Sequence, residues 1–126
     1  MFSDNQYDPG IPIYTQIITK IKLRILTGEW LPGERIPAVR ELAMEFGVNP
    51  NTMQRSLSEL ERDGFLFSER TAGRFITRDA ALIDEARRQM AKQVIAAFIR
   101  QMEQMGYSRR DIADALAAQL TEGGRT

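Results

Sequence analysis

Residues 47–64 read GVNPNTMQRSLSELERDG, and this stretch carries the start and stop signals of one complete helix. Asn49 is a favoured N-cap residue, and Pro50 has the fixed backbone angle that suits the first helical position. Gly64 can adopt the left-handed conformation that closes a helix. The stretch therefore predicts a helix over residues 50–63.

The two faces of this predicted helix have different chemistry. Apolar residues recur at intervals of four and three, which predicts that one face packs on a core. The other face is rich in Asn, Gln and Arg, whose side chains form paired hydrogen bonds to base edges, near a helix N-terminus that attracts phosphate. An ordinary solvated face is the alternative interpretation. The apolar face holds Met53, Leu57 and Leu60, and the polar face holds Asn51, Gln54, Arg55, Ser58 and Arg62.

The neighbouring segments decide between these interpretations. Residues 37–46 form a short amphipathic segment, and residues 47–49 make a tight corner that contains glycine. Two helices joined in this way are typical of a helix-turn-helix, whose second helix enters the DNA major groove. Residues 65–70 and 73–78 then predict two strands around a turn. The expected fold is mainly α with a small β-hairpin, a winged helix-turn-helix.

The N-terminal part has simpler patterns. Residues 1–10 are polar and predict a loose arm. Residues 13–26 have apolar residues at helical spacing and predict the first core helix, closed by Gly28. Residues 35–36 predict a short strand added to the wing. The outer face of the first helix is expected to carry Lys20, Lys22 and Arg24.

Composition limits the classes of function. The chain has 126 residues, 43% of them hydrophobic and 27% charged, which suits one domain plus an appendage. It has no Cys and no His, so no thiolate site is available and the commonest general base is missing; catalysis and a metal site are therefore disfavoured. No apolar run has the length of a membrane span, and we expect a cytoplasmic protein.

The net charge is zero, although DNA-binding domains are often basic. Residues 11–78 carry ten Lys and Arg against eight Asp and Glu, and residues 79–126 carry seven of each. The positive potential is thus modest and local, so affinity would depend on a few placed contacts and on two copies acting together. A winged-helix module that docks on protein, without sequence-specific DNA binding, is the alternative.

The C-terminal part predicts two helices. The first runs from about residue 80 to 105 and ends at Gly106, and residues 108–111 form a capping box that starts a second helix at Arg109. Two helices of fewer than fifty residues cannot close their own core, so their apolar stripe needs a partner. We expect a second copy of the chain, through Ile83, Met90, Val94, Phe98, Met102, Ile112 and Leu116.

Two other interpretations of the stripe stay open. In the first, the two helices pack on the winged helix of their own chain. A small-molecule effector is a further candidate partner, held at the dimer interface by a flexible lining of Met90, Phe98, Met102 and Met105.

Short motifs in this order and at these spacings closely resemble the DNA-binding domain of the GntR family of bacterial transcription regulators. The resemblance covers about residues 11–78 and implies a winged helix that binds double-stranded DNA, with no cofactor. It departs at Ala38, at Asn49-Pro50 and at Thr71, which suggests an altered operator. The motifs include Gly28-x-x-x-Pro32-Gly33-Glu34-Arg35-Ile36-Pro37, Arg40-Glu41-Leu42-Ala43, Gly47-Val48-Asn49, Asn51-Thr52, Leu60-Glu61-x-x-Gly64 and Gly73-x-Phe75.

The resemblance also implies roles for single residues. Arg40 and Gln54, with Asn51 and Arg55 as further candidates, are expected to read bases or to lie beside residues that do, and Thr52 and Arg74 are expected to hold phosphates. Residues 79–122, with Met105-Gly106-Tyr107-Ser108, resemble the short helical dimerisation tail of the YtrA-like subfamily. That similarity implies a homodimeric repressor.

Overall fold

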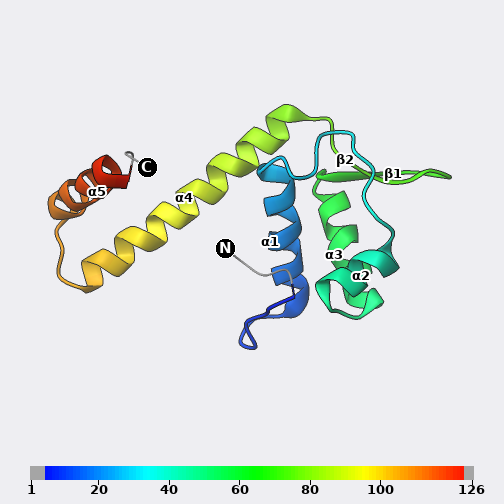
Figure 1. The fold of residues 1–126 in the computed structure, drawn as a ribbon, viewed down its shortest axis with the longest axis horizontal. Coiled ribbons are helices and arrows are strands. Elements are labelled where there is room, and N and C mark those ends of the chain that lie inside the picture. The colour runs from blue at the N-terminus through cyan, green and yellow to red at the C-terminus, as the bar shows by residue number, and fades with distance from the viewer. Residues whose placement is uncertain (1–4, 124–126) are drawn as a thin grey trace. The chain divides into compact units, whose positions relative to one another are not determined.

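The computed structural model describes residues 5–123, which contain five helices and one antiparallel hairpin (Figure 1). The predicted order of elements is confirmed. The chain divides into two compact units between Ala86 and Arg87. The elements are α1 (Ile13–Leu26), α2 (Val39–Phe46), α3 (Pro50–Arg62), β1 (Leu66–Glu69), β2 (Gly73–Ile76), α4 (Ala80–Gln104) and α5 (Arg109–Gly123).

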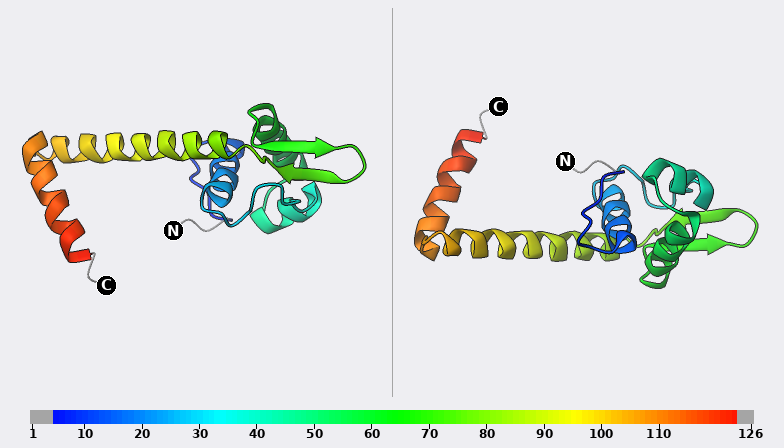
Figure 2. Two further views of the ribbon diagram at one scale, coloured as in Figure 1. Left: turned by 90° about the horizontal axis from the view of Figure 1, so that it is seen from above. Right: turned by 90° about the horizontal axis from the view of Figure 1, so that it is seen from below.

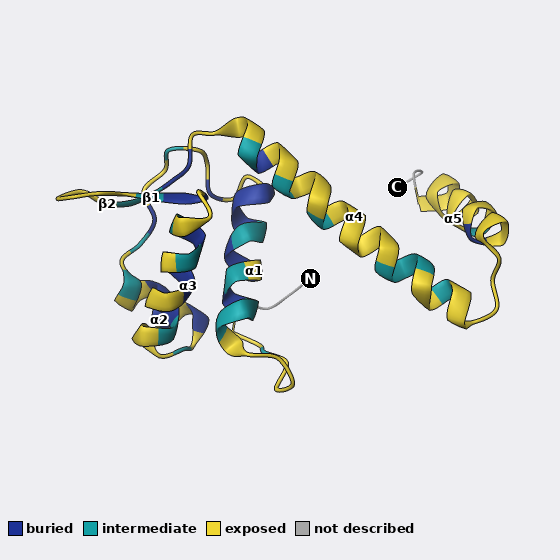
Figure 3. Cartoon of the chain, turned by 180° about the vertical axis from the view of Figure 1, so that it is seen from behind, coloured by how far each residue is buried: buried dark blue, intermediate teal, exposed yellow. Residues whose placement is uncertain are grey.

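The core of the first unit lies where α3 packs against α1, α2 and β1. Figure 3 shows the buried residues of α1 and α3 on the sides that face each other. Full burial of each such side chain contributes about 1.5–3 kcal/mol to the stability of the fold. The apolar residues that recur at helical spacing in the sequence are therefore the ones that hold these helices together. The most deeply buried side chains are Ile17, Ile21, Leu42, Phe46, Met53, Leu57, Leu60 and Ile76.

The hairpin is shorter than predicted and receives a third segment at its edge. β1 pairs with β2 in the register Leu66↔Ile76 to Glu69↔Gly73, and the tip of the hairpin extends beyond α2 and α3 (Figure 2). The predicted strand at residues 35–36 is confirmed as a single bridge, Arg35↔Phe75. The backbone N–H of Ile76 also donates to Glu34 O at 2.8 Å, so the loop before α2 fixes the base of the wing.

The prediction of a loose N-terminal arm is wrong for the part that the structure describes, residues 5–10; residues 1–4 lie outside it. The Tyr7 hydroxyl donates to the carbonyl oxygen of Phe46 at 2.6 Å, one of the carbonyls that the end of α2 leaves without a helical partner. The amide of Gln16 donates to Asp8 O at 2.8 Å and accepts from Asp8 N at the same distance. The arm is therefore fastened to α1 and to the end of α2.

Two cations expected on the outer face of α1 are buried instead. Lys20 is 7% exposed; its ammonium donates to Gln6 O at 2.7 Å and lies 4.6 Å from the centre of the Tyr7 ring. Arg24 is 8% exposed and forms ion pairs with Glu29 and Glu45. Long basic side chains can bury their stems when the charged end finds a partner, and here the arm, Glu29 and α2 supply those partners.

Replacing Tyr7 with Phe tests the fastening of the arm. The substitution removes only the hydroxyl and leaves the Phe46 carbonyl without that donor, so we expect the free energy of unfolding to fall by about 1–2 kcal/mol. Urea unfolding followed by the fluorescence of Trp30 measures it. Tyr107→Phe is the matched control, because Tyr107 is 43% exposed in the second unit; equal and negligible effects from both variants would contradict the fastening.

The second unit consists of α5 and the greater part of α4. Gly106, at φ 93°, follows the end of α4, and the Ser108 hydroxyl accepts from Asp111 N at 3.1 Å as the N-cap of α5. Ile112 is 5% exposed. A cleft of about 220 Å³ between α4 and α5 is lined by Ile95, Phe98, Ile99, Arg109, Ile112, Ala113 and Leu116.

Candidate nucleic-acid interface

The corner between α2 and α3 is built by one glycine and one capping side chain. Gly47 adopts the left-handed conformation at φ 68°, which a residue with a Cβ adopts only with strain. The side chain of Asn49 then accepts from the backbone N–H of Asn51 at 2.7 Å, and Pro50 begins α3. These contacts confirm the predicted start of the helix and set the direction in which α3 leaves the turn.

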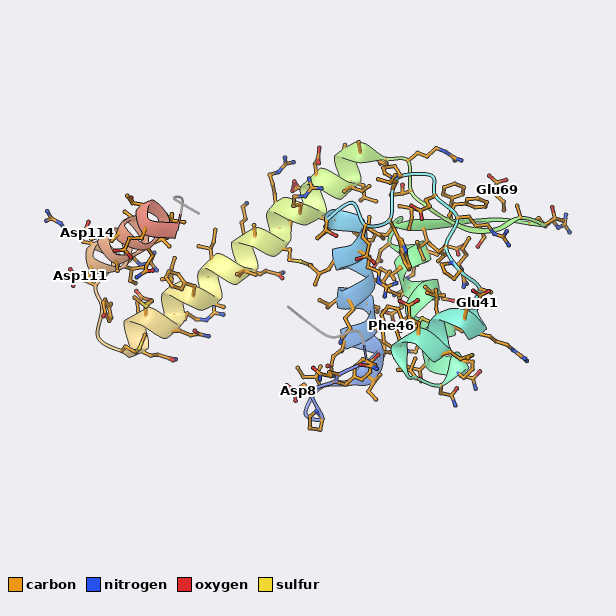
Figure 4. The ribbon with its side chains drawn as sticks, viewed as in Figure 1. Asp8, Glu41, Phe46, Glu69, Asp111 and Asp114 are labelled. Carbon is orange, nitrogen blue, oxygen red and sulfur yellow. The ribbon has the colours of Figure 1, made fainter. Side chains whose placement is uncertain are left out.

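The polar face of α3 is exposed as the pattern predicts. Asn51, Gln54 and Arg55 are exposed, and Thr52 is half-buried, in the first turns of α3. Arg40 is exposed in the first turn of α2, on the helix that carries Glu41 in Figure 4. The N-terminal turns of α2 and α3 therefore present these predicted side chains to solvent.

One predicted residue, Arg55, is held by a neighbour that the sequence pattern did not suggest. Its guanidinium carbon lies 3.6 Å from the centre of the Tyr14 ring. This cation–π contact fixes a long side chain that would otherwise be free to rotate. Arg55 and Tyr14 line a shallow depression of about 420 Å³ together with Ile13, Asn51 and Thr52. The positive end of the α3 dipole lies in its wall, which favours an anionic group there.

A second group of side chains joins α3 to the wing. The Arg74 guanidinium donates from Nε to Glu61 Oε1 at 3.1 Å and from Nη1 to Gln54 Oε1 at 3.4 Å. The Ser68 hydroxyl donates to the same Glu61 oxygen at 2.8 Å. Gln54 Nε2 in turn donates to the hydroxyl of Ser58 at 3.1 Å. The structure thus brings predicted residues Gln54 and Arg74 together on one continuous surface.

The sequence pattern placed Ser58 on the polar face of α3, but it did not select Tyr14, Glu61 or Ser68 as members of this surface. The signal for Glu61 was present: Ser58 and Glu61 follow Gln54 by four and seven residues, which places all three on one helix face. For Tyr14 and Ser68 no such signal exists, because each meets α3 only through the packing of another element.

Most of the predicted dimerisation residues lie in the second unit with apolar surface exposed. Val94 is 63% and Leu116 is 42% exposed, whereas Met90, Phe98 and Met102 are half-buried. Two of the predicted residues differ. Ile83 is 6% exposed and belongs to the compact unit that ends at Ala86, and Ile112 of α5 is 5% exposed. The single chain already covers both side chains. Further exposed apolar residues of α4 and α5 are Ile95 and Leu120, and Met105 is exposed just after α4.

Across residues 5–123, no three His, Cys, Asp or Glu residues come together in a way that would hold a metal ion. The same residues include no helix with the length and apolar character needed to span a membrane. The cleft between α4 and α5 includes Phe98 but not the three methionines predicted to line an effector site.

Comparisons with known proteins agree with this geometry. The family model described as "Bacterial regulatory proteins, gntR family" matches residues 13–76. The chain is 39% identical to the HTH-type transcriptional regulator YhcF of Bacillus subtilis, covering 96% of this chain and 99% of that one. It is 38% identical to the HTH-type transcriptional repressor YtrA of the same organism, covering 75% of each chain.

Solved structures show the same relationship. A GntR family transcriptional regulator from Listeria monocytogenes superposes with a TM-score of 0.81 at 34% identity, over 89% of this chain and 98% of that one. The DNA-binding domain of AraR in complex with its operator ORR3 superposes with a TM-score of 0.52 at 30% identity, over 57% of this chain and 87% of that one. The chain belongs to the GntR family of bacterial DNA-binding transcription regulators, which are not enzymes.

Proposed function

We propose that this protein represses transcription by binding a pseudo-palindromic operator as a homodimer. In this proposal α3, predicted as residues 50–63, lies in the major groove, and the hairpin of residues 65–78 is the wing. The observation that carries it is the joining of Gln54 on α3 to Arg74 on β2 at 3.4 Å, because this places a base-reading amide and a wing cation on one surface. The relatives support it, since YtrA is named a repressor and AraR is solved on its operator.

The residues divide into two roles. Arg40 and Gln54, with Asn51 and Arg55, read bases or lie beside residues that do, and Thr52 and Arg74 contact phosphates. Base contacts give sequence preference, whereas phosphate contacts give affinity that is nearly independent of sequence. The two roles therefore separate in a binding experiment.

The homodimer is proposed from the apolar surface of the second unit. Val94 and Leu120 are 63% and 66% exposed although both are large and apolar, and exposed apolar surface of this kind is typical of interaction sites. Two copies related by a two-fold axis would present two α3 helices to half-sites about 10 bp apart, or a multiple of that spacing. A small-molecule effector at that interface stays a prediction, as does a cytoplasmic location.

The division of roles is tested with a duplex selected by the protein and a scrambled duplex of equal length. We expect Gln54→Ala to reduce the preference for the selected duplex by about 1–3 kcal/mol, the value of one paired base contact. Thr52→Ala should instead weaken binding to both duplexes by a similar factor, about tenfold. Titrations at two salt concentrations measure both quantities.

The outcomes also separate DNA reading from protein docking. A steep salt dependence together with a clear preference for the selected duplex supports the proposal. Weak binding that is equal for both duplexes in the wild type would contradict it and would favour a protein-docking module. If Gln54→Ala kept the full preference, Gln54 would not be the reading residue.

A further inference from the structure

We infer that Glu61 is a positioning residue for sequence recognition: it holds Arg74 of the wing so that Arg74 fixes the orientation of the Gln54 carboxamide. This inference rests on the proposed function, because it assigns a role within the same DNA-reading surface. Glu61 would be an unfavourable residue for contact with DNA, since its carboxylate has the same charge as a phosphate. Its place beside two DNA-facing side chains therefore calls for another explanation.

The distances indicate which contact holds Arg74 in place. The bond from Arg74 Nε to Glu61 is charge-assisted and 3.1 Å long, whereas the bond from Arg74 Nη1 to Gln54 is 3.4 Å, beyond the usual range for a strong hydrogen bond. Glu61 is in turn held by the hydroxyl of Ser68 at 2.8 Å. Arg74 is thus fixed mainly by Glu61, and Gln54 receives the orientation that results.

Stability does not explain this arrangement. The side chains of Arg74 and Glu61 are 19% and 35% exposed, and partly exposed ion pairs of this kind contribute little to folding stability. The geometry of the guanidinium is more informative. Its planar fork can reach two acceptors of α3, Glu61 and Gln54, at once, which the single ammonium of Lys cannot do with the same geometry.

The consequence for Gln54 is a single amide orientation. A guanidinium has only donors, so it selects the carbonyl oxygen of Gln54, while the hydroxyl of Ser58 accepts from Nε2 at 3.1 Å. These bonds use one of the two amide hydrogens and one of the two lone pairs. The remaining hydrogen and lone pair form the donor and acceptor with which Gln recognises the N7 and N6 edge of adenine. Fixing the amide beforehand removes the alternative orientation, in which donor and acceptor are exchanged.

The test compares Glu61→Ala with Glu59→Ala. Both variants remove one carboxylate from α3, but Glu59 pairs with Arg62 on the same helix at 3.8 Å and not with the wing. Binding is measured on the selected duplex and on duplexes with a single base pair changed. We expect Glu61→Ala to lower discrimination about tenfold at the base pair where Gln54→Ala also loses it, and to hold or raise affinity for scrambled DNA. Glu59→Ala should keep the discrimination of the wild type.

Two further variants complete the test. In a Gln54→Ala background, Glu61→Ala should cause no additional loss of discrimination, because its effect passes through Gln54. Arg74→Lys keeps the positive charge but loses the planar guanidinium, so it should reduce discrimination at the same base pair. This variant tests the positioning role even if Glu61→Ala folds poorly. Suppose that the wild type prefers the selected duplex over duplexes with one base pair changed. The inference is then overturned if the Glu61→Ala substitution changes the affinity of the protein for all of these duplexes by one common factor. If the wild type itself shows no preference, the proposed function fails, and this inference fails with it.

Discussion

Replacing Val94 with Asp should convert a dimer into a monomer and weaken binding to the selected duplex by about two orders of magnitude or more. Val94 is 63% exposed on α4 in the single chain, in an apolar stripe that we propose to be covered by a second copy. A carboxylate in such an interface would be desolvated without a partner. Once the copies separate, each half-site is bound alone and the gain from linked binding is lost.

The measurement combines light scattering, for the mass in solution, with titration of the selected duplex. Gln93→Asp is the matched control, since it adds the same charge at an exposed residue about 100° around the helix from Val94. The control should remain dimeric with its affinity nearly unchanged. If the Val94→Asp variant is still a dimer with full affinity, Val94 of α4 is not part of the dimer interface. If the wild type is a monomer, packing of the tail on its own chain is favoured.

Replacing Leu57 with Ala should lower the free energy of unfolding of the first unit by about 2–5 kcal/mol. Leu57 is 0% exposed, on the face of α3 that packs in the core, so the substitution leaves a cavity. This loss is a large part of the 5–15 kcal/mol (an approximate range) that stabilises a typical domain. Much of the protein would then be unfolded at moderate temperature, and the apparent DNA affinity would fall with the folded fraction.

Urea unfolding followed by the fluorescence of Trp30 measures this change, because Trp30 is the single tryptophan of the chain and is 8% exposed in the first unit. Met44→Ala is the control: Met44 is 84% exposed on α2, so its truncation should change stability by less than about 0.5 kcal/mol. Equal unfolding midpoints for the two variants would contradict the assignment of the α3 core face.

The helices of the first unit could be predicted from the sequence because each signal is local. The spacing of Met53, Leu57 and Leu60 identifies the buried face of α3, and Asn49 and Gly64 mark its ends. Most predicted reading residues also lie on exposed surface for the same reason, since the side of a helix on which a residue lies follows from periodicity alone.

The features that the sequence did not reveal depend on contacts between distant segments. The docking of the arm rests on the Tyr7 hydroxyl meeting Phe46, which lies 39 residues further along the chain. Lys20 and Arg24 look like solvated residues on a helix face, and contacts with the arm, Glu29 and Glu45 make their burial favourable. The pairing of Glu61 with Arg74 likewise joins two elements whose relation is set by the fold.

The stripe on α4 shows a similar limit. Periodicity predicted one broad apolar face that runs from Ile83 to Met105. In the structure the cleft with α5 also takes in Ile95 and Ile99, while Val94 stays 63% exposed. The apolar stripe turns gradually around α4, so one part of it contacts α5 and another part forms the surface proposed for the second copy. The periodicity alone does not separate these two parts.

We propose that this protein reads DNA sequence as a dimer, and one selection experiment tests this claim. Purified protein is incubated with sheared bacterial genomic DNA at near-physiological salt, and the retained fragments are sequenced. We expect an enriched inverted repeat whose half-sites are centred about 10 bp, or a multiple of that distance, apart. Retention of fragments that share no sequence motif would contradict the claim.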